Sequence, residues 1–111
     1  MSRTSRYDAF VQRLTQGVLD TPGESASALR RAVLERGKRL GSAAGDLPPA
    51  LASYLDKVAR HAYRVTDAEV ESLQASHSDD TLFELTVAAT VGAALHRLER
   101  GMAALRGEEP D

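Results

Sequence analysis

The amino-acid sequence predicts an all-α fold, a compact bundle of about five helices in which the last helix is the longest. Residues 78–105 contain no proline and are rich in alanine and leucine, a composition that favours helix over strand. Upstream, apolar residues recur at intervals of three and four, the spacing of one helix face. Segments with proline, glycine or capping residues separate these runs. With 111 residues the chain is expected to be one domain.

The first predicted helix belongs to a basic N-terminal helical pair, residues 1–41. We expect Ser5 to cap it. Its apolar stripe consists of Tyr7, Phe10, Val11, Leu14 and Val18. The helix should end in the Asp-Thr-Pro-Gly segment at residues 20–23, because proline and glycine together interrupt helices.

The second predicted helix begins at Ser25 or Ser27 and ends at Leu40, and Gly41 is placed to close it in a left-handed conformation. Its inner face is marked by Leu29, Val33 and Leu40. Residues 1–40 carry eight Lys or Arg against four acids, and we interpret this excess as complementary packing or a solvated basic face. Five aromatic residues without tryptophan argue against a nucleic-acid surface. Residues 41–49 should form a flexible linker.

A third helix should start at Pro48 and Pro49, which suit a first helical turn. Its inward face is predicted from the residues Leu51, Tyr54, Leu55, Val58, Ala59 and Ala62. On its outer side, Asp56 and Arg60 are spaced to form an ion pair. This helix opens the predicted core region, residues 48–106, which a flexible tail at 107–111 follows.

Two capping patterns define the remaining helices. Thr66 and Glu69 form a capping box that starts a short fourth helix, which should stop near residues 76–77. Ser78 should cap the long last helix, and the acidic residues that follow it favour the positive end of a helix.

The last helix should be about 40 Å long at 1.5 Å per residue, whereas a domain of this size has a radius of gyration of about 13 Å. Between Leu82 and Leu95 its only charged residue is Glu84, so the helix needs cover on every side. We therefore predict a subunit interface here. Its residues would be Leu82, Phe83, Val87, Val91, Gly92 and Leu95.

The segments VTDAEVESL (65–73) and SDDTLFELTVAATVGAALHRLERGMAAL (78–105) resemble the C-terminal half of the alkylhydroperoxidase D-like, or carboxymuconolactone decarboxylase-like, helical family. The resemblance implies an all-α bundle that assembles as a trimer, hexamer or dimer. Redox members of the family use a Cys-x-x-Cys pair with a nearby histidine. This chain contains no cysteine, which excludes thiol peroxidase activity.

Three functional hypotheses follow. The first is a non-redox relative of that family that acts as an oligomeric structural or accessory subunit, with a small-ligand pocket as one version. The second is a carboxymuconolactone decarboxylase-type enzyme that transfers protons through histidine and glutamate. The third is an interaction module that pairs with a different, related helical chain.

Four residues are candidates for a pocket: His61, Tyr63, Glu84 and His96. A histidine near the end of a helix is favourable without any function. Glu84 could serve a helix N-terminus or pair with an arginine of the second helix. The alternative is a pocket acid whose pKa burial raises. No catalytic residue is assignable from the pattern alone.

Other classes of function are disfavoured. His96 and Glu99 are in the wrong order for a di-iron helix motif, and no phosphate-binding loop or cofactor motif is present, so we expect neither metal nor cofactor. A recognition helix that presents Asp79 and Asp80 would repel nucleic acid. The last helix is too short and polar for a membrane span, and no signal peptide is expected, so a cytoplasmic location is the default.

Overall fold

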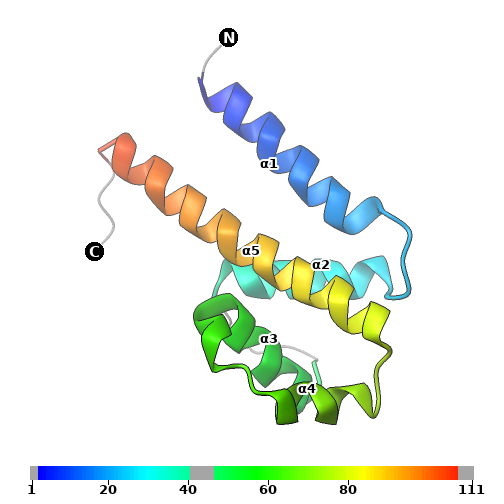
Figure 1. Cartoon of the computed structure of the whole chain (residues 1–111). Helices are drawn as coiled ribbons and strands as arrows, with labels where there is room; N and C mark the ends of the chain where they lie inside the picture. The colour runs from blue at the N-terminus through cyan, green and yellow to red at the C-terminus, as the bar shows by residue number, and fades with distance from the viewer. Residues whose placement is uncertain (1–2, 41–46, 108–111) are drawn as a thin grey trace.

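The computed structural model describes residues 3–40 and 47–107 (Figure 1). Within these ranges the chain forms five α-helices and one 3₁₀ turn and contains no strand, which confirms the predicted all-α class with a long last helix. The elements are α1 (Arg3–Asp20), α2 (Ser27–Lys38), α3 (Pro49–His61), the 3₁₀ turn η1 (Ala62–Arg64), α4 (Asp67–Gln74) and α5 (Asp79–Leu105). Most of the flexible linker predicted at 41–49 and of the tail predicted at 107–111 lies outside the described residues.

The start of α1 and the end of α2, which is Lys38 and not Leu40, differ from the prediction. Helix α1 already begins at Arg3, so Ser5 lies inside the helix and the predicted cap is wrong. Helix α2 starts at Ser27 after Ala26. At its other end Leu40 itself adopts the left-handed conformation, with φ of 53°, and Gly41 lies outside the described residues.

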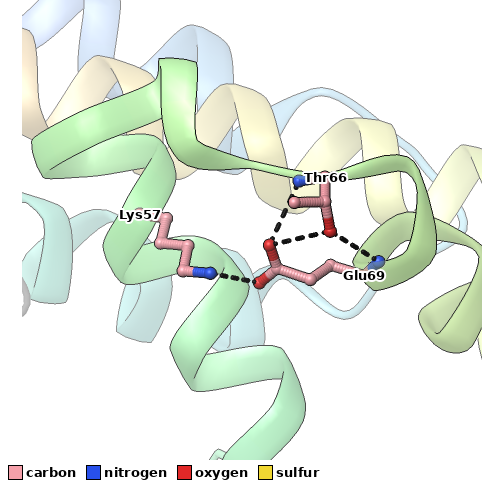
Figure 2. Close-up of polar contacts among 3 residues, drawn as sticks. All are labelled: Lys57, Thr66 and Glu69. Carbon is pink, nitrogen blue, oxygen red and sulfur yellow. Dashed lines mark hydrogen bonds and ion pairs between the residues drawn. The ribbon is translucent and has the colours of Figure 1, made fainter.

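Figure 2 shows the capping box that starts α4, as the sequence predicts. The Thr66 hydroxyl accepts the Glu69 amide at 3.2 Å, and the Glu69 carboxylate accepts the Thr66 amide at 3.1 Å. Its other oxygen accepts a hydrogen bond from Lys57 of α3 at 2.8 Å, which ties α4 to α3. At the start of α5 the Ser78 hydroxyl accepts the Thr81 amide at 3.1 Å, which confirms the second predicted cap.

Helices α2 and α5 pack against each other more extensively than any other pair, and α5 lies across α2 in Figure 1. They approach so closely that a Cβ at Gly37 would lie 2.6 Å from the Ala89 carbonyl oxygen, and one at Gly92 would collide with the Leu34 carbonyl oxygen. Small residues therefore set the distance between the two backbones. Around this crossing lies the core, which includes Val33, Leu34, Leu51, Leu55, Leu73, Leu82, Leu85, Ala88 and Ala89.

Arginine side chains of α2 take part in this packing, in agreement with the complementary-packing interpretation of the basic segment. Arg36 forms a bidentate ion pair with Asp56 of α3, at 2.7 and 2.9 Å. Arg30 is buried and donates to the Leu19 carbonyl at the end of α1, at 3.2 Å. Because Asp56 pairs with Arg36, the predicted pair with Arg60 is wrong; Arg60 donates instead to the Leu40 carbonyl.

The N-terminal half of α1 and the C-terminal half of α5 extend beyond the other helices as a two-helix arm (Figure 1). The Tyr7 hydroxyl donates to the Glu99 carboxylate at 3.2 Å across this arm. The molecule measures 49 × 33 × 22 Å and has a radius of gyration of 15.1 Å, above the roughly 13 Å of a typical domain of this length. Much apolar surface of α1 and α5 is therefore left without cover.

No helix in the described part of the chain combines the length and apolar character that crossing a membrane requires.

The glycine contact makes a testable prediction. Replacing Gly92 by alanine forces the α2 and α5 backbones apart and should lower the free energy of unfolding by about 2 to 3 kcal/mol. Gly17 is the control, because a Cβ there meets no atom within 4 Å, and Gly17→Ala should stabilise α1 by up to about 1 kcal/mol. Urea unfolding of both variants measures the difference, and equal effects would contradict the close packing.

Candidate functional site

Glu84 lies at the start of α5 and binds the segment that leads into α2. One carboxylate oxygen accepts the Glu24 amide at 2.9 Å. The other accepts the Ser25 amide at 2.7 Å and the Ser25 hydroxyl at 2.5 Å. A Cβ at Gly23 would collide with this carboxylate, so a larger residue there would displace the Glu84 side chain. Both oxygens of Glu84 thus hold the turn between α1 and α2 against α5.

These contacts hold the pKa of Glu84 below its ordinary value. The Ser25 hydroxyl has the largest effect, followed by the Ser25 and Glu24 amides, and the charge of Arg30 acts in the same direction. Each favours the ionised carboxylate. The hypothesis of a pocket acid with a raised pKa is therefore wrong. The role of Glu84 is structural, but it binds the turn ahead of the N-cap Ala26 and not the N-terminus of a helix.

The two histidine candidates make their contacts with groups other than Glu84. His61 is exposed at the end of α3, where its ring meets Tyr63 edge-on with 5.8 Å between ring centroids. His96 makes a 2.9 Å hydrogen bond from Nδ1 to the Lys38 carbonyl at the end of α2. On α5, twelve residues separate Glu84 from His96, about 18 Å along the axis. The four candidates therefore do not form one pocket.

Among residues 3–40 and 47–107, no group of three or more His, Asp or Glu side chains is placed to hold a metal ion. A hollow of about 270 Å³ does lie between the end of α1 and the start of α5, with Arg30 and Glu84 in its lining. Phe83 and Val87 line the same hollow. The Glu84 carboxylate already accepts hydrogen bonds from Glu24 and Ser25 of the turn before α2. It is therefore not available in this hollow as a proton acceptor for a ligand.

From Phe83 to Leu105, one face of α5 turns away from α2 and carries no charge. It consists of Phe83, Val87, Thr90, Ala94, Leu98, Gly101 and Leu105, which we call the outer face of α5. These residues fall within an arc of about 80° at 100° per residue. Phe83 is 69% exposed and Leu105 is 82% exposed. The three small residues are also exposed, and Val87 and Leu98 are half-buried.

The outer face differs from the interface that the sequence predicts. Leu82, Gly92 and Leu95 are buried within the chain, so they belong to no surface that another copy could contact. Phe83 is exposed, and Val87 and Val91 are half-buried. The small residues Ala89 and Gly92 admit α2 of the same chain and not another subunit.

A second hollow, of about 460 Å³, lies between the two helices of the arm. Tyr7 and Phe10 of α1 and Leu98 of α5 supply its apolar lining, and Arg6 and Arg13 also line it. Phe10 is 48% exposed, although the predicted stripe of α1 placed it inward. The outer face of α5 is thus continuous with a partly uncovered face of α1.

Sequence reasoning missed Ala94, Leu98, Gly101 and Leu105 because it treated residues 82–95 as apolar on every side. A finer signal was present. Beyond Leu95, the charged residues Arg97, Glu99 and Arg100 lie around the helix so that one strip of α5 carries no charge. That strip continues the positions of Phe83 and Val87 on the helix surface.

No family model, no curated protein and no solved structure matches the chain. The resemblance to the alkylhydroperoxidase D-like family therefore stays a prediction.

The depressed pKa of Glu84 predicts a pH dependence. The stability that its ionised carboxylate provides is complete above the unfolded-state pKa of about 4.3 and is lost as the pH falls through the lower folded-state pKa. Glu84→Gln should lower the urea midpoint at pH 7, and the stability of this variant should fall less steeply than that of the wild type as the pH decreases. Glu71→Gln, at an exposed position of α4, is the control and should keep the wild-type profile. A variant that gains stability relative to wild type at pH 7 would contradict the assignment.

Proposed function

We propose that this protein is a structural or accessory subunit that assembles with further copies through the outer face of α5, as a non-redox relative of the alkylhydroperoxidase D-like family. The observation that carries the proposal is the uncharged strip from Phe83 to Leu105, about 33 Å long at 1.5 Å per residue. Exposed apolar surface that is continuous on this scale is typical of protein–protein contact sites.

Burial of the apolar side chains on the outer face of α5 would contribute free energy to association of two copies. Fully burying a leucine, valine or phenylalanine side chain is worth about 1.5 to 3 kcal/mol. The four large side chains of the outer face are partly exposed, so two copies together could gain on the order of 10 kcal/mol. Association costs about 4 to 15 kcal/mol in lost freedom. The gain from the outer face therefore offsets a cost in the lower or middle part of this range.

The geometry gives less support to an enzyme. A proton-transfer site needs its acid and base within hydrogen-bond reach of one reacting group. Glu84 is occupied by Ser25 and Glu24, and both histidine candidates lie elsewhere. A carboxymuconolactone decarboxylase-type reaction through Glu84 with His61 or His96 has no assembled site among the described residues.

The test is sedimentation velocity at increasing protein concentration, on the wild type and two variants. Phe83→Asp places a charge in the outer face and should weaken association on the order of 10- to 100-fold, because the contact between copies would no longer bury a phenylalanine side chain. Tyr63→Asp is the matched control, because Tyr63 is an aromatic residue 79% exposed on a different surface. It should leave association unchanged.

Both variants should keep the wild-type circular dichroism, because neither side chain contributes to the core. A wild type that stays monomeric at hundreds of micromolar would overturn self-assembly and favour a different helical chain as the partner. Equal weakening by both substitutions would show that the outer face of α5 is not the contact.

A further inference from the structure

We propose that two copies pair antiparallel along the outer face of α5, about a two-fold axis that passes Ala94. This inference rests on the proposed self-assembly and specifies its geometry. A two-fold contact requires that the same surface be complementary to itself. In such an antiparallel pair, a residue a given number of positions before Ala94 in one copy must face the residue the same number of positions after Ala94 in the other copy.

The spacing of the outer face meets this requirement. Its residues follow one another at intervals of four, three and four up to Ala94, and of four, three and four beyond it. The pattern therefore reads the same in both directions about Ala94. An antiparallel partner with the same register places every uncharged residue of one copy against an uncharged residue of the other.

Side-chain sizes agree with this register. Val87 faces Gly101 of the second copy, and Thr90 faces Leu98, so larger side chains lie opposite smaller ones. Phe83 faces Leu105 at each end, where both side chains are most exposed. At the axis Ala94 faces Ala94, which lets the helices approach to the 8 to 10 Å usual for packed helices. A Cβ at Gly101 meets no atom within 4 Å, so this position is open to a partner.

The charges of α5 favour antiparallel over parallel pairing. The helix begins with Asp79 and Asp80, and its later turns carry Arg97 and Arg100. Antiparallel pairing keeps the acidic starts of the two helices at opposite ends of the contact, and it also opposes the two helix dipoles. Parallel pairing would bring the four aspartates of two copies together at one end.

The flanks of the outer face are held in place by neighbouring helices. On one side Tyr7 of α1 bonds to Glu99, and on the other Arg97 donates to the Ala59 carbonyl of α3 at 2.9 Å. Tyr54 of α3 also bonds to Thr86 at 2.6 Å. The face is therefore presented on a helix that is fixed from both sides.

Disulfide trapping tests the register, because the chain contains no cysteine of its own. A disulfide needs Cα atoms about 4.4 to 6.8 Å apart. Under mild oxidation with copper phenanthroline, Ala94→Cys should form a covalent dimer on a non-reducing gel. Phe83→Cys alone and Leu105→Cys alone should not, since the two copies of either residue would lie about 33 Å apart. A mixture of these two variants should form the mixed dimer.

The matched control is Ala104→Cys, an exposed alanine on the same helix whose copies would lie about 30 Å apart. It should stay unlinked. Circular dichroism and sedimentation of each variant before oxidation establish that it folds and associates.

Self-linking of Phe83→Cys together with Ala94→Cys would indicate parallel pairing and overturn the inference. Association without any link at Ala94 would overturn this register while leaving the proposed function standing. A wild type that is monomeric by sedimentation would overturn both.

Discussion

The close approach of α2 and α5 is the contact on which the rest of the structure depends. Gly37 and Gly92 remove the side chains that would hold the two backbones apart, and Ala89 fills the remaining space. This contact fixes which face of α5 points inward. Because α2 has 12 residues and α5 has 27, α2 covers only part of the longer helix. The arm is a direct consequence of this difference in length, and the outer face is the side of α5 that the contact turns away from α2.

Much of the fold follows from local sequence signals. The caps at Thr66 and Ser78 were predictable because each satisfies backbone amides with a side chain a few residues away. The inward face of α3 was predictable from spacing, and Leu51, Leu55 and Ala59 are indeed buried. Ala62, which was predicted on the same face, lies in η1 and is exposed. The orientation of α5 was not predictable in this way. Its apolar residues surround the helix, so only the partner helix decides which of them become core.

The same limit applies to the candidate site. A lone glutamate in an apolar helix indicates a special environment, but the sequence does not say which groups surround it. The partners of Glu84 come from residues 24 and 25, about sixty positions earlier, and they are chiefly backbone amides and a serine hydroxyl. Backbone donors leave no residue-type signature. From the sequence, the Glu84 carboxylate was a candidate for a pocket acid. In the fold it binds the turn before α2 to α5.

The arm has a consequence for local motion. Helix α5 is continuous, yet the amide hydrogens near Ala89 can exchange with solvent only when α2 and α5 separate, whereas those of the last turns need only local fraying. The rate of hydrogen exchange should therefore rise along a single helix from its middle to Leu105. Contact with a second copy along the outer face would slow exchange most in that distal half, where exchange is otherwise fastest. Exchange rates along this one helix would therefore measure both folding and assembly.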